Sequence, residues 1–258
     1  MTATAVFRWD DFNATAIAER FGLSHVELHA EVGSTLDVAH ELAEKGAPSG
    51  TLVVADAQLA GRGRMGRAWS SEPGRGVWCT VIERPLDPAI LDTLSLRVGL
   101  LLAESLDTHA GQPVGLKWPN DLVIGERKLA GILVEARWSG SALAWVCVGV
   151  GVNVLPPLGV ENATGLASGT RRIDVLSAVI AAIRFAAARQ GPLTPHELSR
   201  YAARDALAGR RILSPASGVV RGIDANGALV VQTEHGLEPH RTGTVRLAEE
   251  GKEGEVAS

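Results

Sequence analysis

The sequence predicts an α+β fold in which a large domain of helices and strands is followed by a small β-rich domain. Helical patterns alternate with apolar, strand-like runs up to about residue 206. From residue 207 onward, short β runs separated by turn residues replace them. We therefore expect a large domain at 1–206, a small barrel-like domain at 207–248 and a disordered tail at 249–258, which is charged and rich in small residues.

Capping and turn residues at the ends of periodic apolar patterns predict where each helix and strand begins and ends. The expected helices are 11–21 with Asp10 or Asp11 as N-cap, 34–45, 91–109, 174–190 with Asp174 as N-cap, and 195–207. The expected strands of the large domain are 26–32, 51–55, 77–82, 114–118, a hairpin of 122–124 with 128–135, and 142–154. The last strand is almost wholly apolar and is therefore placed centrally. In the small domain, Asn226-Gly227 predicts a hairpin, with further β runs at 211–213, 218–220 and 243–245.

Composition and charge narrow the class of protein. A chain of 258 residues can bury a core without a metal or disulfide staple. The net charge of −4 argues against a surface that coats nucleic acid. Cys79 and Cys147 lie in apolar runs, which predicts reduced, buried thiols in a cytoplasmic protein. No apolar stretch of 18 residues and no secretory pattern occur, so we expect neither a membrane span nor a signal peptide.

A loop rich in glycine and arginine at 61–76 carries the strongest chemical signal. Its residues 61–67 read G-R-G-R-M-G-R and contain the G-x-G-x-x-G spacing of dinucleotide-binding turns, with Glu83 about twenty residues further on. A nicotinamide-dependent oxidoreductase would need a helix directly after this turn, and residues 68–76 cannot form one. Arginines alternating with glycines instead favour a clamp for phosphate and carboxylate oxygens over a merely solvated loop.

Other segments are ambiguous when taken singly. Lys117-Trp118-Pro119-Asn120-Asp121 contains a turn-forming pair, and Lys128 starts a strand in which Gly131 suggests a close approach of a ligand or another backbone. Ser34-Thr35-Leu36-Asp37 is an ordinary helix-capping signal, and 149–153 is a buried strand. His25 and His29 would suggest a metal site on a helix, but on the expected strand they line its polar face.

Together these segments resemble one family, the biotin protein ligases, or biotin–[acetyl-CoA-carboxylase] ligases. The matching segments are 33–35, 58–67, 117–122, 128–133 and 149–153, in the family's order and spacing, and the resemblance covers about residues 26–247. It implies a catalytic domain like that of class II aminoacyl-tRNA synthetases, a mixed sheet flanked by helices, and a C-terminal SH3-like barrel. It also implies two steps: biotin and Mg-ATP form biotinyl-5′-AMP, and a lysine of a biotin carboxyl carrier protein then takes the biotinyl group.

The resemblance implies roles for individual residues. Arg64, Lys128 and Asp121 would be catalytic, with Asp121 orienting or deprotonating the acceptor lysine. The implied biotin-binding residues are Ser34, Thr35, Leu36, Gln58, Arg62, Gly63, Arg64, Lys128 and Gly131. The implied ATP- and adenylate-binding residues are Arg62, Arg64, Arg67, Trp69, Lys117, Asn120, Lys128 and Asn153. Asn120 would also lie near Mg²⁺.

Two departures from the family and several alternatives accompany this interpretation. Leu36 replaces a frequent Asn, which weakens a ring contact but keeps a backbone N–H at the helix start, and Met65 replaces a frequent Arg. A lipoate or octanoate ligase would share the fold, whereas the motifs together favour biotin. A biotin-sensing DNA-binding regulator is disfavoured because only about thirty-three residues precede Ser34. Monomer and homodimer both remain open.

Overall fold

The computed structural model describes residues 7–84 and 87–248, in two β-sheets with helices around the larger one. The predicted tail at 249–258 lies outside the described residues. The α-helices are α1 Ala14–Phe21, α2 Thr35–Glu44, α3 Leu94–Ala110, α4 Arg172–Ala187 and α5 Pro195–Ala202, with short 3₁₀ turns η1 Arg64–Gly66 and η2 Pro88–Asp92. Among the described residues, none of the helices combines the length and apolarity that crossing a membrane requires.

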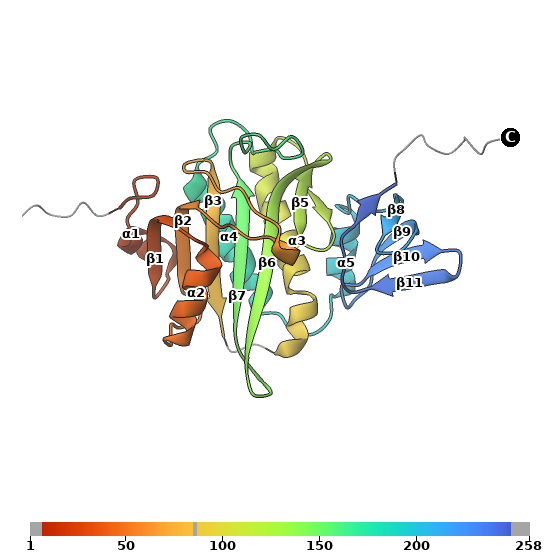
Figure 1. Ribbon diagram of the computed structural model, residues 1–258, viewed down its shortest axis with the longest axis horizontal. Helices are drawn as coiled ribbons and strands as arrows, with labels where there is room; N and C mark the ends of the chain where they lie inside the picture. The colour runs from red at the N-terminus through yellow and green to blue at the C-terminus, as the bar shows by residue number, and fades with distance from the viewer. Residues whose placement is uncertain (1–6, 85–86, 249–258) are drawn as a thin grey trace, which may run out of the picture.

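The larger sheet has seven strands in the order β1-β2-β3-β7-β6-β5-β4. These are β1 Val26–Val32, β2 Leu52–Gln58, β3 Gly76–Glu83, β4 Gly115–Lys117, β5 Asp121–Ile124, β6 Arg127–Ser139 and β7 Ala142–Asn153. The β1–β2 pair is parallel and the other pairs are antiparallel, so the sheet is mixed. The predicted central position of the apolar strand is confirmed, because β7 lies between β3 and β6 (Figure 1).

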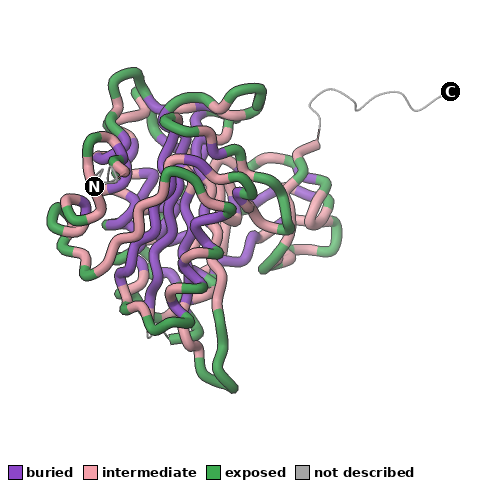
Figure 2. Tube along the Cα trace, turned by 60° about the vertical axis from the view of Figure 1, so that its left-hand side comes forward, coloured by how far each residue is buried: buried purple, intermediate pink, exposed green. Residues whose placement is uncertain are grey.

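The two faces of this sheet are covered differently. Helices α3 and α4 pack against each other and against one face (Figure 1). The main apolar core lies between them and the strands, and Figure 2 shows the buried segments gathered in the middle of the molecule. The opposite face carries α2, which buries Leu36, Ala39 and Ala43 in a smaller cluster against the sheet. The rest of that face lies beneath the glycine-arginine loop, which leaves room for a site there.

The C-terminal residues form a five-stranded antiparallel sheet in the order β11-β10-β9-β8-β12. Its strands are β8 Arg211–Ser214, β9 Gly218–Ile223, β10 Leu229–Thr233, β11 Gly236–His240 and β12 Arg246–Leu247. The predicted hairpin at Asn226-Gly227 is confirmed as the turn between β9 and β10. The main core continues into this sheet, because Ile212, Val220 and Leu229 belong to the same buried cluster as α3 and α4. The Trp118 indole N–H also donates to the Gly227 carbonyl oxygen across the junction at 2.9 Å.

Several predicted element ends were wrong, and at the starts of α1 and α4 the carboxylate predicted as the N-cap forms an ion pair instead. The N-cap of α1 is Asn13 rather than Asp10 or Asp11, and Asp10 instead forms an ion pair with Arg172. Asp174 is not the N-cap of α4 but lies within its first turn, paired with the preceding Arg171. Helix α5 ends at Ala202, earlier than predicted, and begins with a capping box of Thr194 and Glu197.

Two further differences concern the β segments. The predicted β run at 243–245 is not a strand, and β11 was not predicted. His25 lies just before β1 and bonds to Glu27 of that strand at 3.0 Å, and no group of three or more metal-ligating side chains occurs in the described part of the chain. The expected strand is confirmed at 26–32, with His29 on it and His25 just before it.

Candidate active site

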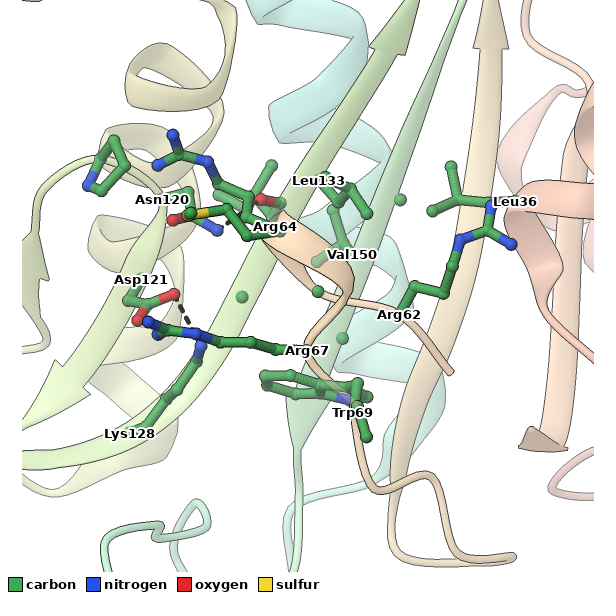
Figure 3. A pocket seen from close by; sticks show the side chains of 18 of the residues that line it. Leu36, Arg62, Arg64, Arg67, Trp69, Asn120, Asp121, Lys128, Leu133 and Val150 are labelled. Atoms are coloured by element: carbon green, nitrogen blue, oxygen red, sulfur yellow. Dashed lines mark hydrogen bonds and ion pairs between the residues drawn. The ribbon is translucent and has the colours of Figure 1, made fainter. Parts of the chain in front are cut away.

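One cavity of about 190 Å³ lies between the sheet face and the glycine-arginine loop (Figure 3). It brings together segments that are distant in sequence: the start of α2, the loop, the β4–β5 connection, and strands β6 and β7. The predicted residues that line it are Ser34, Thr35, Leu36, Gln58, Arg62, Gly63, Arg64, Arg67, Trp69, Lys117, Asn120, Asp121, Lys128 and Gly131. Asn153 is the exception: it is buried, its side chain lies 3.4 Å from the Lys128 carbonyl oxygen, and it does not line the cavity.

Glycines on the paired strands β6 and β7 make the floor of the cavity. Gly131 lies opposite Gly151 in the strand register. A Cβ added at Gly131 would come within 3.0 Å of the Trp69 ring, and one added at Gly151 would come within 2.6 Å of it. At Gly149 a Cβ would come within 3.1 Å of Leu36. The space that Gly131 was predicted to leave for a ligand or another backbone is thus occupied by the protein's own indole, which lies close to both strands.

One end of the cavity is a buried chain of hydrogen bonds. Gln58 Oε1 accepts from the Thr35 backbone N–H at 2.9 Å and its hydroxyl at 3.2 Å, while Gln58 Nε2 donates to Ser71 Oγ at 2.8 Å. The Thr80 hydroxyl donates to Thr35 Oγ1 at 2.9 Å. The backbone N–H of Leu36 is engaged by the Ser34 cap at 3.3 Å. These fixed donors and acceptors suit a small, flat, neutral polar group.

The other end of the cavity is charged. Lys128 Nζ lies 2.7 Å from Asp121 Oδ1 and 5.0 Å from the centre of the Trp69 ring. Burial lowers the pKa of Arg64 below its ordinary value, the neighbouring Arg67 lowers it further, and Asp121 opposes both effects. A bound anion would stabilise the Arg64 cation that burial disfavours. This end therefore suits phosphate or carboxylate oxygens.

The arginines of the loop point in two directions (Figure 3). Arg64 and Arg67 extend toward Asn120 and Asp121, whereas Arg62 extends toward Leu36. Arg62 forms ion pairs with Asp37 at 2.6 Å and Glu135 at 3.6 Å. The hydrogen bond that Arg62 donates to the Asp37 carboxylate is the largest cause of its raised pKa. The structure thus places the Arg62 guanidinium away from the charged end, where an ATP contact was predicted.

The loop is closed mainly by its own backbone. Gly63 N–H donates to the Arg67 carbonyl oxygen at 2.7 Å, and Trp69 N–H donates to Gly61 at 2.8 Å. Met65 adopts a left-handed φ of 56° and is largely exposed. The 3₁₀ turn η1 was not predicted. As predicted, no α-helix follows it before β3, which removes the dinucleotide-binding interpretation.

Sequence reasoning missed the contribution of the C-terminal unit. Gly243, Thr244 and Val245 line the cavity, and Thr244 Oγ1 accepts a hydrogen bond from Arg67 at 3.2 Å. Thr80, which supports Thr35, was also missed because it is an ordinary strand residue in sequence. Asn120 is fixed by its side-chain amide, which donates to the Ile132 carbonyl oxygen at 2.8 Å.

Comparisons with known proteins agree with this geometry. Residues 31–153 match the model of the biotin/lipoate A/B protein ligase family, and residues 211–247 match that of the biotin protein ligase C terminal domain. The chain is 33% identical to the bifunctional ligase/repressor BirA of Bacillus spizizenii, over 88% of this chain and 77% of that one. It is 32% identical to the biotin–[acetyl-CoA-carboxylase] ligase of Paracoccus denitrificans, over 72% and 85%.

A relative that matches over a shorter segment and one solved structure agree with these comparisons. The identity to the Bacillus subtilis BirA is 43%, over 52% of this chain and 44% of that relative. The structure of the Aquifex aeolicus biotin protein ligase in complex with biotin and ATP superposes with a TM-score of 0.71 at 26% identity, covering 88% of this chain and all of that one. The predicted fold, a mixed sheet with helices followed by a β-rich C-terminal unit, is confirmed. The chain therefore belongs to the biotin protein ligase family.

Proposed function

We propose that this biotin protein ligase activates biotin with ATP to biotinyl-5′-AMP and then transfers the biotinyl group to a lysine of a biotin carboxyl carrier protein. The observation that carries the proposal is a single cavity with a neutral hydrogen-bonding end and a cationic end. Biotin has the matching halves, a flat ureido ring and a carboxylate. Ser34, Thr35, Gln58 and the backbone at Gly131 would hold the ring end, and Leu36 and Gly63 would line it.

In the first step the biotin carboxylate oxygen attacks the α-phosphate of ATP and pyrophosphate leaves. Carboxylate and phosphate repel each other, by roughly 4 kcal/mol at 4 Å near a protein surface. Arg64 and Lys128, supported by Arg67 and Lys117, would offset this repulsion and hold the two reactants in line. Trp69 would pack beside the adenylate, with Asn120 near the nucleotide. Asn153, buried beneath Lys128, would act on the nucleotide only by supporting the Lys128 backbone.

In the second step the neutral amine of the acceptor lysine attacks the acyl carbon and AMP leaves. Asp121 would accept a hydrogen bond from this amine and orient it, because its carboxylate is already held by Lys128 at 2.7 Å. Asn120 and Asp121 supply the oxygen donors that Mg²⁺ prefers, with ATP phosphates completing its ligands. When bound, the metal would neutralise charge on the phosphates.

The proposed reaction requires a protein partner, and the two cysteines bear on the cellular compartment. A biotin carrier domain presents an exposed lysine, and the cavity opens to the surface beside the loop and the C-terminal unit. Cys79 and Cys147 are free and buried, as expected of a protein kept in the reducing cytoplasm, which is the proposed compartment.

The test is intact-mass spectrometry of a biotin carrier domain incubated with the protein, Mg-ATP and either biotin or lipoate. We expect an ATP-dependent mass gain of one biotinyl group on one lysine. A lipoyl gain instead would keep the mechanism and refute the assignment of the ring end. No gain with either acid would refute the ligase proposal.

A further inference from the structure

A buried hydrogen-bonded network beside the cavity reaches the loop through Arg62. It starts from the spacing of α2, in which Leu36 and His40 are four residues apart and so lie on one face. Leu36 covers Gly149, and His40 covers Cys147, two residues back on β7. Glu135 lies opposite Cys147 in the β6–β7 register, which brings its carboxylate to the same imidazole.

The contacts define which atoms of His40 donate. The Trp145 indole Nε1–H lies 3.0 Å from His40 Nδ1, and an indole nitrogen can only donate. His40 Nδ1 is therefore the acceptor, and the ring carries its proton on Nε2. That Nε2–H donates to Glu135 Oε2 at 2.9 Å. His40 is only 6% exposed, so this orientation is enforced by burial.

The second oxygen of the same carboxylate faces the loop. Glu135 Oε1 lies 3.6 Å from the Arg62 guanidinium, whose other nitrogen is 2.6 Å from Asp37. Arg62 thus connects the loop to both α2 and β6, at the side of Leu36. The residues that follow, 63–67, are held chiefly by contacts within the loop. Arg62 is therefore one point where the loop is fastened to the body of the protein, and Arg67, which donates to Thr244 Oγ1 at 3.2 Å, is another.

We propose that His40 and Glu135 are positioning residues: they orient Arg62, and through it they fix the loop over bound biotin and its adenylate. The inference rests on the proposed function, because it concerns the same cavity. Neither side chain lines the cavity, so neither touches the reactants. A looser Arg62 would let the loop open more often, which would speed loss of ligand without removing a catalytic group.

The experiment is a double-mutant cycle with Glu135→Gln, Arg62→Ala and the double variant. The readouts are the Kd of biotin by calorimetry and the rate at which biotinyl-5′-AMP leaves the preloaded protein. The ion pair between Glu135 and the partly exposed Arg62, at 3.6 Å, contributes up to about 1 kcal/mol, so Glu135→Gln should change either readout by up to about fivefold. The double variant should be no worse than Arg62→Ala alone, because Glu135 acts through Arg62.

Two further variants make the result specific. His40→Phe keeps a ring of similar size but removes the Nε2–H, so it should reproduce part of the Glu135→Gln effect. It provides a second test of the inference if Glu135→Gln folds poorly. Glu126→Gln breaks an ion pair with Arg210, at 3.0 Å and outside the cavity lining, and should leave both readouts unchanged. Trypsin cleavage at the loop arginines of the ligand-free protein should be faster in Glu135→Gln and His40→Phe than in Glu126→Gln.

Unchanged biotin affinity and adenylate release in Glu135→Gln and His40→Phe would overturn the inference. Additive losses in the double variant would also overturn it, because Glu135 would then act independently of Arg62. Failure of the wild-type protein to biotinylate a carrier domain would refute the proposed function instead, and the proteolysis comparison would still report on the loop.

Discussion

Adding one methyl group at Gly151 should displace Trp69 and disable the cavity without unfolding the protein. A Cβ at this position would lie 2.6, 2.7 and 2.9 Å from three atoms of the indole, Nε1, Cε2 and Cζ2. Carbon contacts are favourable at about 3.5–4.0 Å, so the ring must move by about 1 Å. The same ring lies close to the other strand, since a Cβ built at Gly131 would lie 3.0 Å from it, so the ring cannot shift toward that strand to avoid the overlap.

The displacement has two measurable costs. Overpacking of this kind lowers the free energy of unfolding by about 1–3 kcal/mol. A misplacement of about 1 Å near reacting groups can lower a rate about 100-fold. We therefore expect Gly151→Ala to remain folded and to lose about 100-fold in biotin-dependent exchange of pyrophosphate into ATP. Chemical denaturation supplies the free energy of unfolding for the same samples.

A glycine of α3 supplies the control variant, and a Trp69→Ala background tests the packing argument. Gly99 lies in α3, where a Cβ would meet its neighbours at 3.5 Å or more, so Gly99→Ala should leave the exchange rate unchanged and should not lower the free energy of unfolding. In a Trp69→Ala background, Gly151→Ala should no longer be destabilising, since the overlap is gone. A Gly151→Ala protein with wild-type stability and exchange rate would refute the packing argument.

Three further predictions follow from charged groups. Lys128→Ala should lower adenylate formation by about 10²–10³-fold in the pyrophosphate-exchange assay, by removing a donor to developing charge, whereas the exposed Lys45→Ala should have no effect. Arg97→Met should lower the free energy of unfolding by about 3–5 kcal/mol in chemical denaturation, because Arg97 is 2% exposed and pairs with a carboxylate of α5 at 2.9 Å. The Arg204 hydrogen bond lowers the pKa of Asp107, so its stabilisation is full above the unfolded-state pKa and is lost as pH falls through the lower folded-state pKa; Asp107→Asn should therefore flatten stability against pH on the acid side.

Local patterns were sufficient for much of the fold. The alternating strand at 26–32, the apolar strand at 142–154 and the absence of a helix after Gly66 depend on neighbours in sequence, and the structure agrees with each. The N-cap of α1 was mispredicted because Asp10 is held by Arg172, which is 162 residues away in sequence. No local pattern contains that contact.

The same distinction applies to the candidate site. The resemblance to the family implied fourteen residues that line the cavity, but not the direction of each side chain. Arg62 points away from the charged end because it forms ion pairs with Asp37 on α2 and Glu135 on β6, and no pattern within the loop contains these contacts. Thr244 enters the site only because the C-terminal sheet docks beside the loop.

The core shared by the two sheets makes the C-terminal unit a poor candidate for removal. Ile212, Val220 and Leu229 are buried in the cluster that also contains α3 and α4, and Trp118 hydrogen-bonds across the junction. A truncation near residue 206 would expose these apolar surfaces to water and leave the indole N–H without its acceptor. The predicted division at 206/207 would then separate sequence patterns without separating folding units, and the two sheets should melt in one cooperative transition.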